Sequence, residues 1–350
     1  MTSRLREAIP PLDAEAGARA RAALDQLTKP PGSLGRLEEL AWRLAEITGL
    51  CPPRLEEPVI LTLAADHGVV AQGVSAYPQV VTAQMVETLL RGGAAVSVLA
   101  RHVGARVVIA DLGVATPIPD HPALVRRSIR PGTADMARGP AMTREEAETA
   151  IAVGIDLVEV EHARGADLVA TGEMGIGNTT AAAAMVAVLA GLAPAEVTGP
   201  GTGLDRRGRA RKVRAIETAI AVNRPDPDDA VDVLAKVGGL EIAGLVGIIL
   251  GAAARRLPVV LDGFIAGAAA LAAVRLRPEA CPYLLAAHRS AEPGHRRVLE
   301  ALGLEPYLDL GMRLGEGTGA ALCIGLARAG VRLLAEMATF KSAGVSGRAP

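Results

Sequence analysis

The chain alternates apolar runs of strand length with longer segments of helical period. The runs expected to form strands lie at 58–65, 106–112, 166–171, 258–264 and 283–287, with a shorter one at 307–310. The segments expected to form helices between them lie at 79–101, 143–164, 178–190, 205–222, 228–236 and 240–256. This alternation predicts an α/β fold with a doubly wound, mostly parallel sheet of six strands and helices on both faces.

The N-terminal segment follows a different pattern. Residues 12–27 and 33–49 have the spacing of two amphipathic helices, with Ser33 as the expected cap of the second. A last helix over about 318–338 could return to this hairpin. We therefore expect a small helical lobe of residues 1–55, joined by about 330–350, and a large α/β domain of residues 56–329.

Composition narrows the class of partners. The chain has 350 residues, a formal net charge of -1 and only two Phe, one Trp and three Tyr, so it lacks the basic, aromatic face of a nucleic-acid groove. Its three cysteines, Cys51, Cys281 and Cys323, show neither CxxC nor HxxxH spacing, which argues against a disulfide framework and a zinc site. Because no disulfide framework is indicated, we expect a cytoplasmic protein. We expect no membrane span, because the longest uncharged stretch, 174–195, is mostly Ala and Gly with interspersed polar residues.

A glycine-rich stretch, 172–184, follows the apolar run that ends near residue 170 and opens an Ala-rich helical segment. Glycines at a strand-to-helix turn let backbone N–H groups approach an anion, and Asn178 or Thr179 could cap the helix. A phosphate suits this place, although a tight turn with a solvated Glu173 would have the same sequence. Glu173 would repel a phosphate unless the ligand also carried positive charge, as does a phosphorylated sugar that becomes cationic at its reacting carbon.

Polar residues follow nearly every predicted strand: Asp66, His67, Asp111, Glu173, Asp262, His288 and Glu316. In open parallel sheets ligands bind outside the carboxyl ends of the strands, so these side chains are expected to converge on one crevice. Taken singly, Asp66 and Asp262 are expected to hold loop N–H groups. His67 and His288 are expected to be hydrogen-bonded loop histidines.

Three further glycine-rich loops, at 199–205, 290–294 and 315–319, are candidates for the same crevice. The first leads into a basic helix in which Lys212 is the expected charge partner of a phosphate. No GxxxxGK[ST] loop, GxGxxG fingerprint or pyrophosphate loop is present, so a monophosphate is favoured over ATP, NAD or phosphoribosyl pyrophosphate. Glu316, between two glycines, is either a general base with an uncrowded carboxylate or a Glu that favours a helix N-terminus.

Several motifs in order along residues 25–340 resemble those of the nicotinate-nucleotide:dimethylbenzimidazole phosphoribosyltransferase family. They are Lys29-Pro-Pro-Gly-Ser-Leu-Gly-Arg-Leu-Glu38, Ala65-Asp-His-Gly-Val69 with Gly73-Val-Ser-Ala-Tyr-Pro78, Gly172-Glu-Met-Gly-Ile-Gly-Asn-Thr-Thr180, Leu261-Asp-Gly-Phe264, His288-Arg-Ser-Ala-Glu-Pro-Gly294 and Leu314-Gly-Glu-Gly-Thr-Gly319. The resemblance implies transfer of 5-phosphoribose from nicotinate mononucleotide to 5,6-dimethylbenzimidazole for the lower ligand of cobalamin. It also implies a Rossmann-like large domain, a homodimer, and no metal or other cofactor.

The resemblance also implies roles for individual residues. Glu316 matches the family's catalytic base, and Glu173 and Lys212 match residues of its nucleotide site. Asp135, in the loop 132–136, stands where relatives carry Asn, which leaves the role of that loop open. The residues expected to bind the base are Ser75, Tyr77, Gln84, Met174 and Leu314. Those expected to bind the phosphate and nucleotide are Gly175, Ile176, Gly177, Asn178, Thr179, Gly201, Thr202, Gly203, Lys212, Ser290 and Ala291.

The chemistry of the donor fits these roles. Its pyridinium nitrogen is already positively charged, so nicotinate can leave without an acid, through an oxocarbenium-like transition state that Glu173 can stabilise. Glu316 would take the N–H proton of the attacking azole, and attack from the opposite face would invert the anomeric carbon. The alternatives are the same transfer to another acceptor, such as adenine or a phenol, and a non-catalytic sensor of mononucleotides.

Overall fold

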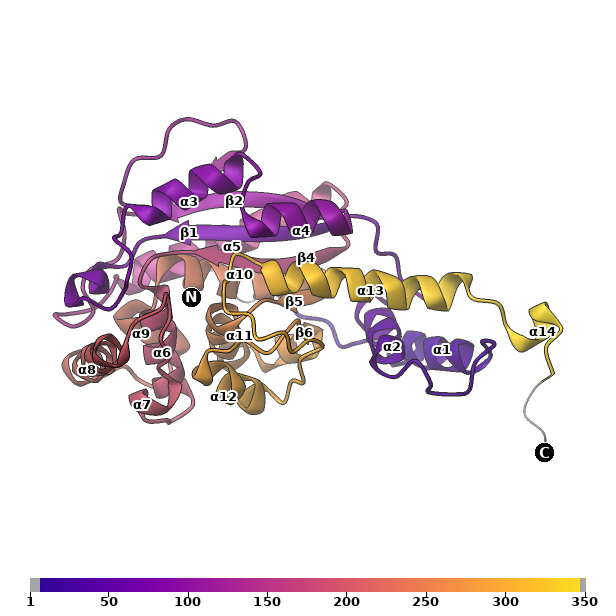
Figure 1. The fold of residues 1–350 in the computed structure, drawn as a ribbon. Helices are drawn as coiled ribbons and strands as arrows, with labels where there is room; N and C mark the ends of the chain where they lie inside the picture. The colour runs from indigo at the N-terminus through magenta and orange to yellow at the C-terminus, as the bar shows by residue number, and fades with distance from the viewer. Residues whose placement is uncertain (1–6, 347–350) are drawn as a thin grey trace.

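A six-stranded sheet in the order β3-β2-β1-β4-β5-β6 forms the centre of the computed structural model, which describes residues 7–346 (Figure 1). All neighbouring strands pair in parallel. The strands are β1 (Pro58–Ala65), β2 (Arg106–Gly113), β3 (Leu124–Arg126), β4 (Leu168–Met174), β5 (Val259–Leu261) and β6 (Leu284–Ala286). The doubly wound parallel sheet is therefore confirmed.

Two strand predictions were wrong. The run at 307–310 is not a strand of the sheet and contributes only a bridge between Leu308 and His288. The remaining strand is instead β3, which was not predicted. Strand β5 ends at Leu261 and a helix begins at Phe264, so the predicted strand over 258–264 is shorter than expected. A short polar-flanked run such as 124–126 has too few residues to show a period.

Most predicted helices are present within two or three residues of the expected bounds. The helices observed in the α/β body are α3 (Val81–Leu90), α4 (Ala95–Val103), α5 (Arg144–Ala163), α6 (Asn178–Leu189), α7 (Pro194–Val197), α8 (Arg206–Asn223), α9 (Ala230–Val237), α10 (Leu240–Ala254), α11 (Phe264–Leu276), α12 (Pro293–Leu302) and α13 (Thr318–Glu336), with short 3-10 helices η2 (Gly68–Gln72) and η3 (Pro278–Tyr283). The segment 79–101 is two helices rather than one, because the chain turns at Gly92 with φ of +73°. Helices α7, α11 and α12 were not predicted.

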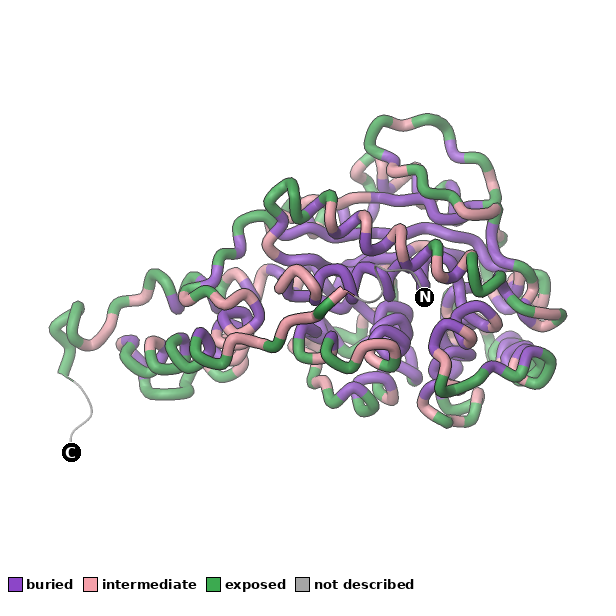
Figure 2. The backbone as a smooth tube through the Cα atoms, turned by 180° about the vertical axis from the view of Figure 1, so that it is seen from behind, coloured by how far each residue is buried: buried purple, intermediate pink, exposed green. Residues whose placement is uncertain are grey.

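Alternate residues of β1 pack against helices on opposite faces of the sheet. Val59, Leu61 and Leu63 belong to a core shared with α5, α6, α10 and α11. Ile60 and Ala64 belong to a second core shared with α3, α4 and α13. Every residue of β1 is buried, as expected for a strand covered on both sides. Figure 2 shows the same concentration of buried positions in the sheet and its flanking helices.

A helical arm extends from one end of this body (Figure 1). It contains α1 (Ala14–Asp25), α2 (Arg36–Thr48) and α14 (Phe340–Ala343), and the end of α13 packs on it through Leu334 beside Ala20 and Ala41. The predicted return of the last helix to the N-terminal hairpin is confirmed. Ser33 does not cap α2, because the helix begins after Gly35, whose φ is +54°.

Helix α13 is the one helix in the described part of the chain that is long and apolar enough to cross a membrane. Its mean hydropathy is 1.4, and 56% of its apolar window is buried inside the protein. It packs against α2, α4 and β4. A core helix of this length passes the same test of length and composition.

Candidate active site

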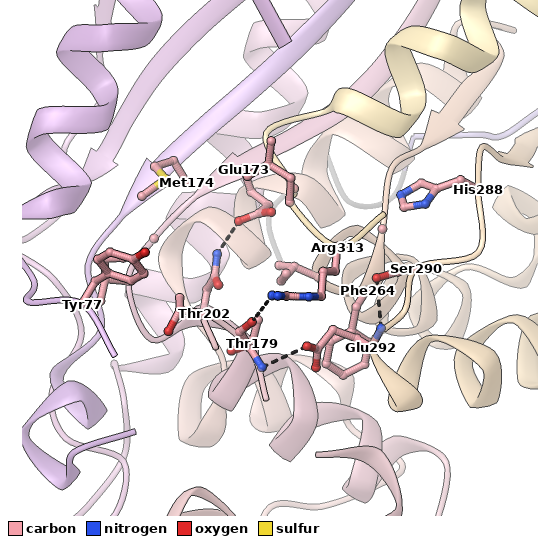
Figure 3. A pocket seen from close by; sticks show the side chains of 18 residues that line it. Tyr77, Glu173, Met174, Thr179, Thr202, Phe264, His288, Ser290, Glu292 and Arg313 are labelled. Atoms are coloured by element: carbon pink, nitrogen blue, oxygen red, sulfur yellow. Dashed lines mark hydrogen bonds between the residues drawn. The ribbon is translucent and has the colours of Figure 1, made fainter. Parts of the chain in front are cut away.

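A cavity of about 350 Å³ lies at the carboxyl end of β4 (Figure 3). Its walls come from the first turn of α6 and from the loops that precede α8, α11, α12 and α13. The lining residues are Tyr77, Glu173, Met174, Gly175, Ile176, Asn178, Thr179, Gly201, Thr202, Gly263, Phe264, Ile265, His288, Ser290, Glu292, Arg313, Leu314 and Gly315. Loops distant in the chain therefore meet where the polar residues at strand ends were predicted to converge.

The turn between β4 and α6 presents a helix N-terminus to the cavity. Helix α6 begins at Asn178 directly after Gly177, whose φ of +99° is readily adopted only by glycine. The expectation that Asn178 or Thr179 caps α6 was wrong. The amide of Asn178 donates instead to the carboxylate of Glu173, and the hydroxyl of Thr179 accepts from Lys212. The partial positive charge of this helix end is suited to an anion.

Lys212 lies behind the cavity wall rather than in it. Its ammonium is fully buried and donates to Thr179 Oγ1 at 2.6 Å. A Cβ added to Gly201 would lie 2.9 Å from Lys212 Nζ, so glycine lets this loop cross close over the lysine. Burial lowers the pKa of Lys212 from 10.5 to about 8, and the negative charge of Glu292 partly offsets that effect. Glu292 also accepts a hydrogen bond from the N–H of Gly201 at 2.9 Å.

Glu173 is the buried carboxylate of the opposite wall. Asn178 donates to its Oε2, and a Cβ at Gly315 would overlap its Oε1. Burial is the largest cause that raises the pKa of Glu173 to about 8, followed by repulsion from Asp262. Glu173 and the loop before α13 are therefore in direct contact.

Glu316 lies next to the cavity but does not line it. Its carboxylate is buried with Oε2 at 3.5 Å from the N–H of Val96, so the expectation of an uncrowded carboxylate was wrong. Its backbone has φ of +65°, which costs a non-glycine residue about 1 kcal/mol or more. Burial raises the pKa of Glu316, the hydrogen bond from Val96 opposes this, and the charge of Asp262 adds to it. A carboxylate with a raised pKa is a stronger base.

Asp262 holds the loop that carries Glu316. Its carboxylate accepts from the N–H groups of Gly317, Gly319 and Ala320 at 3.2, 2.7 and 3.0 Å. The expectation that Asp262 binds loop N–H groups is confirmed. Burial raises its pKa to about 7 against the effect of these donors.

The polar residues near β1 and β2 have structural partners. Asp66 accepts from the N–H of Ala115 at 2.8 Å, as expected, and Asp111 accepts from Val114 N at the same distance. His67 Nε2 lies 2.7 Å from Glu241 Oε1, so it is a hydrogen-bonded loop histidine as predicted. These residues support the cavity from outside.

The residues expected to bind the base divide into two groups. Met174 lines the cavity together with Tyr77 and Leu314, which are 54% and 59% exposed and so form an open apolar mouth. Ser75 lies behind them, with its hydroxyl 3.3 Å from Thr202 Oγ1. Gln84 is an exposed residue of α3, outside the lining.

Seven of the predicted site residues do not line the cavity: Ser75, Gln84, Gly177, Gly203, Lys212, Ala291 and Glu316. Sequence reasoning gave no site role to Phe264, Glu292 or Arg313, which do line it. Phe264 and Glu292 lie within two of the motifs that carry the family resemblance, but the site roles in those motifs were given to other residues. Arg313 Nη1 donates to the carbonyl of Gly201 at 3.0 Å and joins two loops that nothing in the sequence connects.

The loop 132–136 supports the segment that leads to the cavity mouth. Gln72 Nε2 donates to Asp135 Oδ2 at 2.6 Å, and the N–H of Gly68 donates to Thr133 Oγ1 at 3.3 Å. Between residues 7 and 346, no group of three or more His, Cys, Asp or Glu side chains is arranged to hold a metal ion.

Comparison with known proteins gives a consistent result. A family model described as phosphoribosyltransferase matches residues 9–345. A nicotinate-nucleotide–dimethylbenzimidazole phosphoribosyltransferase from Chloroflexus aurantiacus is 60% identical over 338 residues, 97% of this chain and 96% of its own. One from Geobacter sulfurreducens is 57% identical over 336 residues, 96% of either chain. The crystal structure of the Thermus thermophilus enzyme of that name has a TM-score of 0.91 at 51% identity, covering 96% of this chain and all of the other.

Proposed function

Because the chain belongs to the nicotinate-nucleotide:dimethylbenzimidazole phosphoribosyltransferase family, we propose that it transfers 5-phosphoribose from nicotinate mononucleotide to 5,6-dimethylbenzimidazole. It is a phosphoribosyltransferase; the donor and acceptor are those in the names of its relatives. The products would be nicotinate and α-ribazole 5'-phosphate, a building block of the cobalamin lower ligand. The anomeric carbon would be inverted.

The phosphate end of the donor would bind at the first turn of α6. The backbone around Gly175 and Ile176 and the helix dipole favour an anion there, and the ammonium of Lys212 supports that charge from behind Thr179. Gly201, Thr202 and Ser290 complete the wall around this end. Holding the phosphate in this way fixes the sugar relative to the carboxylates.

The reacting carbon would lie beside Glu173. The pKa of about 8 keeps this carboxyl largely neutral at pH 7 in the free enzyme. The pyridinium of the donor brings positive charge, which favours the ionised carboxylate. The carboxylate then stabilises the oxocarbenium character that develops as nicotinate leaves.

Glu316 would act as the general base for the incoming azole. Its hydrogen bond from Val96 is long at 3.5 Å and its neighbour Gly315 lines the cavity, and the proposal requires the side chain to rotate from this position toward a bound acceptor. The acceptor ring would lie between Tyr77, Met174 and Leu314. As one ring nitrogen attacks the sugar carbon, the proton of the other passes to Glu316.

One observation carries this proposal: a single cavity joins a helix N-terminus backed by Lys212 to the contact between Glu173 and the loop of Glu316. The test is to incubate the enzyme with nicotinate mononucleotide and 5,6-dimethylbenzimidazole and to identify the riboside by mass and by its anomeric proton signal. An α-riboside phosphate is expected. A β-riboside would contradict inversion, and binding of the mononucleotide without turnover would support a sensor.

The identity of the acceptor needs its own test, because an apolar pocket discriminates weakly between similar rings. Adenine and phenol compete with 5,6-dimethylbenzimidazole in one reaction, and the ratio of products is measured. We expect the benzimidazole product to dominate. A dominant adenine or phenol product would assign the same transfer to a different acceptor.

We also propose a homodimer in the cytoplasm, with residues 1–55 and about 330–350 as a small lobe beside the domain of residues 56–329; residues 1–6 and 347–350 of that lobe lie outside the described residues. The family resemblance supports the dimer, and the packing of Leu334 beside Ala20 and Ala41 supports the lobe. Sedimentation equilibrium measures whether the protein is a dimer. Limited proteolysis tests the lobe, which predicts preferential cleavage near residue 55.

A further inference from the structure

His288 lies in the cavity wall with unsatisfied ring nitrogens. It is 2% exposed and lines the cavity beside Ser290. Its Nδ1 is buried without a hydrogen bond to any described residue. Its Nε2 lies 3.9 Å from Asp262 Oδ1, which is too long for a hydrogen bond. By geometry the ring therefore has no hydrogen-bond partner among the described residues, so the expectation of a hydrogen-bonded loop histidine is not met; the backbone of Arg289 only partly offsets the burial that lowers the pKa of His288.

The other two buried histidines differ in this respect. His67 pairs with Glu241 at 2.7 Å, and His295 Nδ1 accepts from the N–H of Ser290 at 2.9 Å. Asp262 already accepts from the N–H groups of Gly317 and of the first turn of α13, so its carboxylate is hydrogen-bonded without His288. A ligand in the cavity would supply the partner that Nε2 lacks.

Nε2 is the atom that such a ligand would meet. A Cβ at Gly263, another lining residue, would be 3.4 Å from Nε2, so glycine leaves this approach open. A Cβ at Gly319 would overlap Cδ2 of the ring and lie 2.6 Å from Nε2, so glycine at this position also leaves room for the imidazole. Figure 3 shows the imidazole at the edge of the pocket with one ring nitrogen directed toward it.

The surroundings select the chemistry of the partner. Burial lowers the pKa of His288, so the ring is neutral near pH 7, with one nitrogen donating and the other accepting. A hydroxyl can donate or accept and therefore fits either tautomer. A carboxylate or phosphate oxygen can only accept, so it fits only the tautomer with the proton on Nε2, and Asp262 at 3.9 Å disfavours a second negative charge there.

We propose that His288 binds a ribose hydroxyl of the mononucleotide through Nε2 and so positions the sugar for transfer. This role rests on the proposed function, because it requires a phosphoribosyl donor in the cavity. With the phosphate at the first turn of α6, the sugar would be held at two points.

The test compares wild type, His288→Asn and His288→Gln on nicotinate mononucleotide and its 2'-deoxy and 3'-deoxy analogues. Asn has no atom at the Nε2 position, whereas the Gln amide reaches it. We expect His288→Asn to lower kcat/KM for the natural donor about 10- to 100-fold, as for one lost hydrogen bond. We expect wild type and His288→Asn to be equal on the one analogue that lacks the contacted hydroxyl, and His288→Gln to recover part of the loss.

His102→Asn, a substitution of an exposed histidine of α4, is the matched control and should leave all three donors unchanged. An equal loss on all donors, or no loss on any, would overturn the contact. If circular dichroism shows that His288→Asn does not fold, the wild-type enzyme alone decides the question. A lower kcat/KM on one deoxy analogue than on the natural donor supports the contact, and equal values on all three donors overturn it. If wild type turns over no donor, the proposed function fails separately, and calorimetric dissociation constants for the same three nucleotides still decide the contact.

Discussion

The ammonium of Lys212 donates to the hydroxyl of Thr179 at 2.6 Å and so ties the basic helix α8 to the first turn of α6. This contact places the one buried lysine of α8 directly behind the candidate phosphate site. Neither helix alone would bind a phosphate firmly, since a helix end supplies only partial charge. Together they would give a bound donor a defined orientation.

We predict that Lys212→Met raises KM for the mononucleotide by about tenfold or more, because it removes the positive charge and the charged hydrogen bond to Thr179 behind the candidate phosphate site, and a charged hydrogen bond contributes about 1.5–3 kcal/mol. In wild type, KM should rise as the pH passes about 8, since Lys212 then loses its proton. The Met variant should show a flat KM in that range. Initial rates between pH 6.5 and 9.5 measure this, with Lys341→Met, an exposed residue of α14, as the control.

For Glu316→Gln we expect kcat to fall by about 10² to 10⁴, the usual contribution of a general base. The dissociation constant of the mononucleotide should not change, because Glu316 does not line the cavity. Single-turnover rates and calorimetric binding separate the two effects. Glu305→Gln, at a side chain that is 79% exposed, is the matched control. Full activity in Glu316→Gln would exclude the proposed base.

Glu173 should make stability depend on pH. Its folded pKa of about 8 exceeds its ordinary value of 4.5, so its contribution is fully present below pH 4.5 and is lost as the pH rises towards 8. Glu173→Gln does not titrate and should raise the free energy of unfolding at pH 8 relative to wild type, by an amount on the order of 3 kcal/mol. Urea unfolding at pH 5 and pH 8 measures this. The same pH dependence in both proteins would contradict it.

Gly172 should tolerate no side chain. A Cβ there would lie 2.6 Å from Thr62 Oγ1 and would overlap the carbonyl oxygen of Glu316. We predict that Gly172→Ala displaces the loop of Glu316 and destabilises the protein by about 1–3 kcal/mol, as overpacking does. Gly139→Ala, where a Cβ meets nothing within 4 Å, should be nearly neutral. Thermal melts and kcat values for the two variants check this.

The sheet and the location of the site were predictable from the sequence because both follow from local pattern. Strand β1 has the predicted bounds, and Glu173 and Asp262 converge at strand ends as the topology requires. Helix α11 was not predicted because its run of Ala, Leu and Ile has no polar position before Arg275 and so shows no helical period. Periodicity cannot separate a buried strand from a buried helix in such a run.

The details of the site depended on contacts that the sequence does not encode locally. Nothing in the order of residues places the N–H of Val96 against Glu316, or Arg313 against the carbonyl of Gly201. Burial likewise decides that Lys212 is behind the wall and His288 is without a partner. Both depend on packing between segments far apart in the chain.

Helix α13 begins one residue beyond Gly317, in the loop that Asp262 holds, and it ends against α1 and α2. With 19 residues it forms a rod roughly 28 Å long. Because a helix behaves as a rigid body, a displacement of the arm that tilts α13 would also move the backbone at the other end of the helix. Binding of another molecule to the arm would therefore change the position of the Glu316 carboxylate.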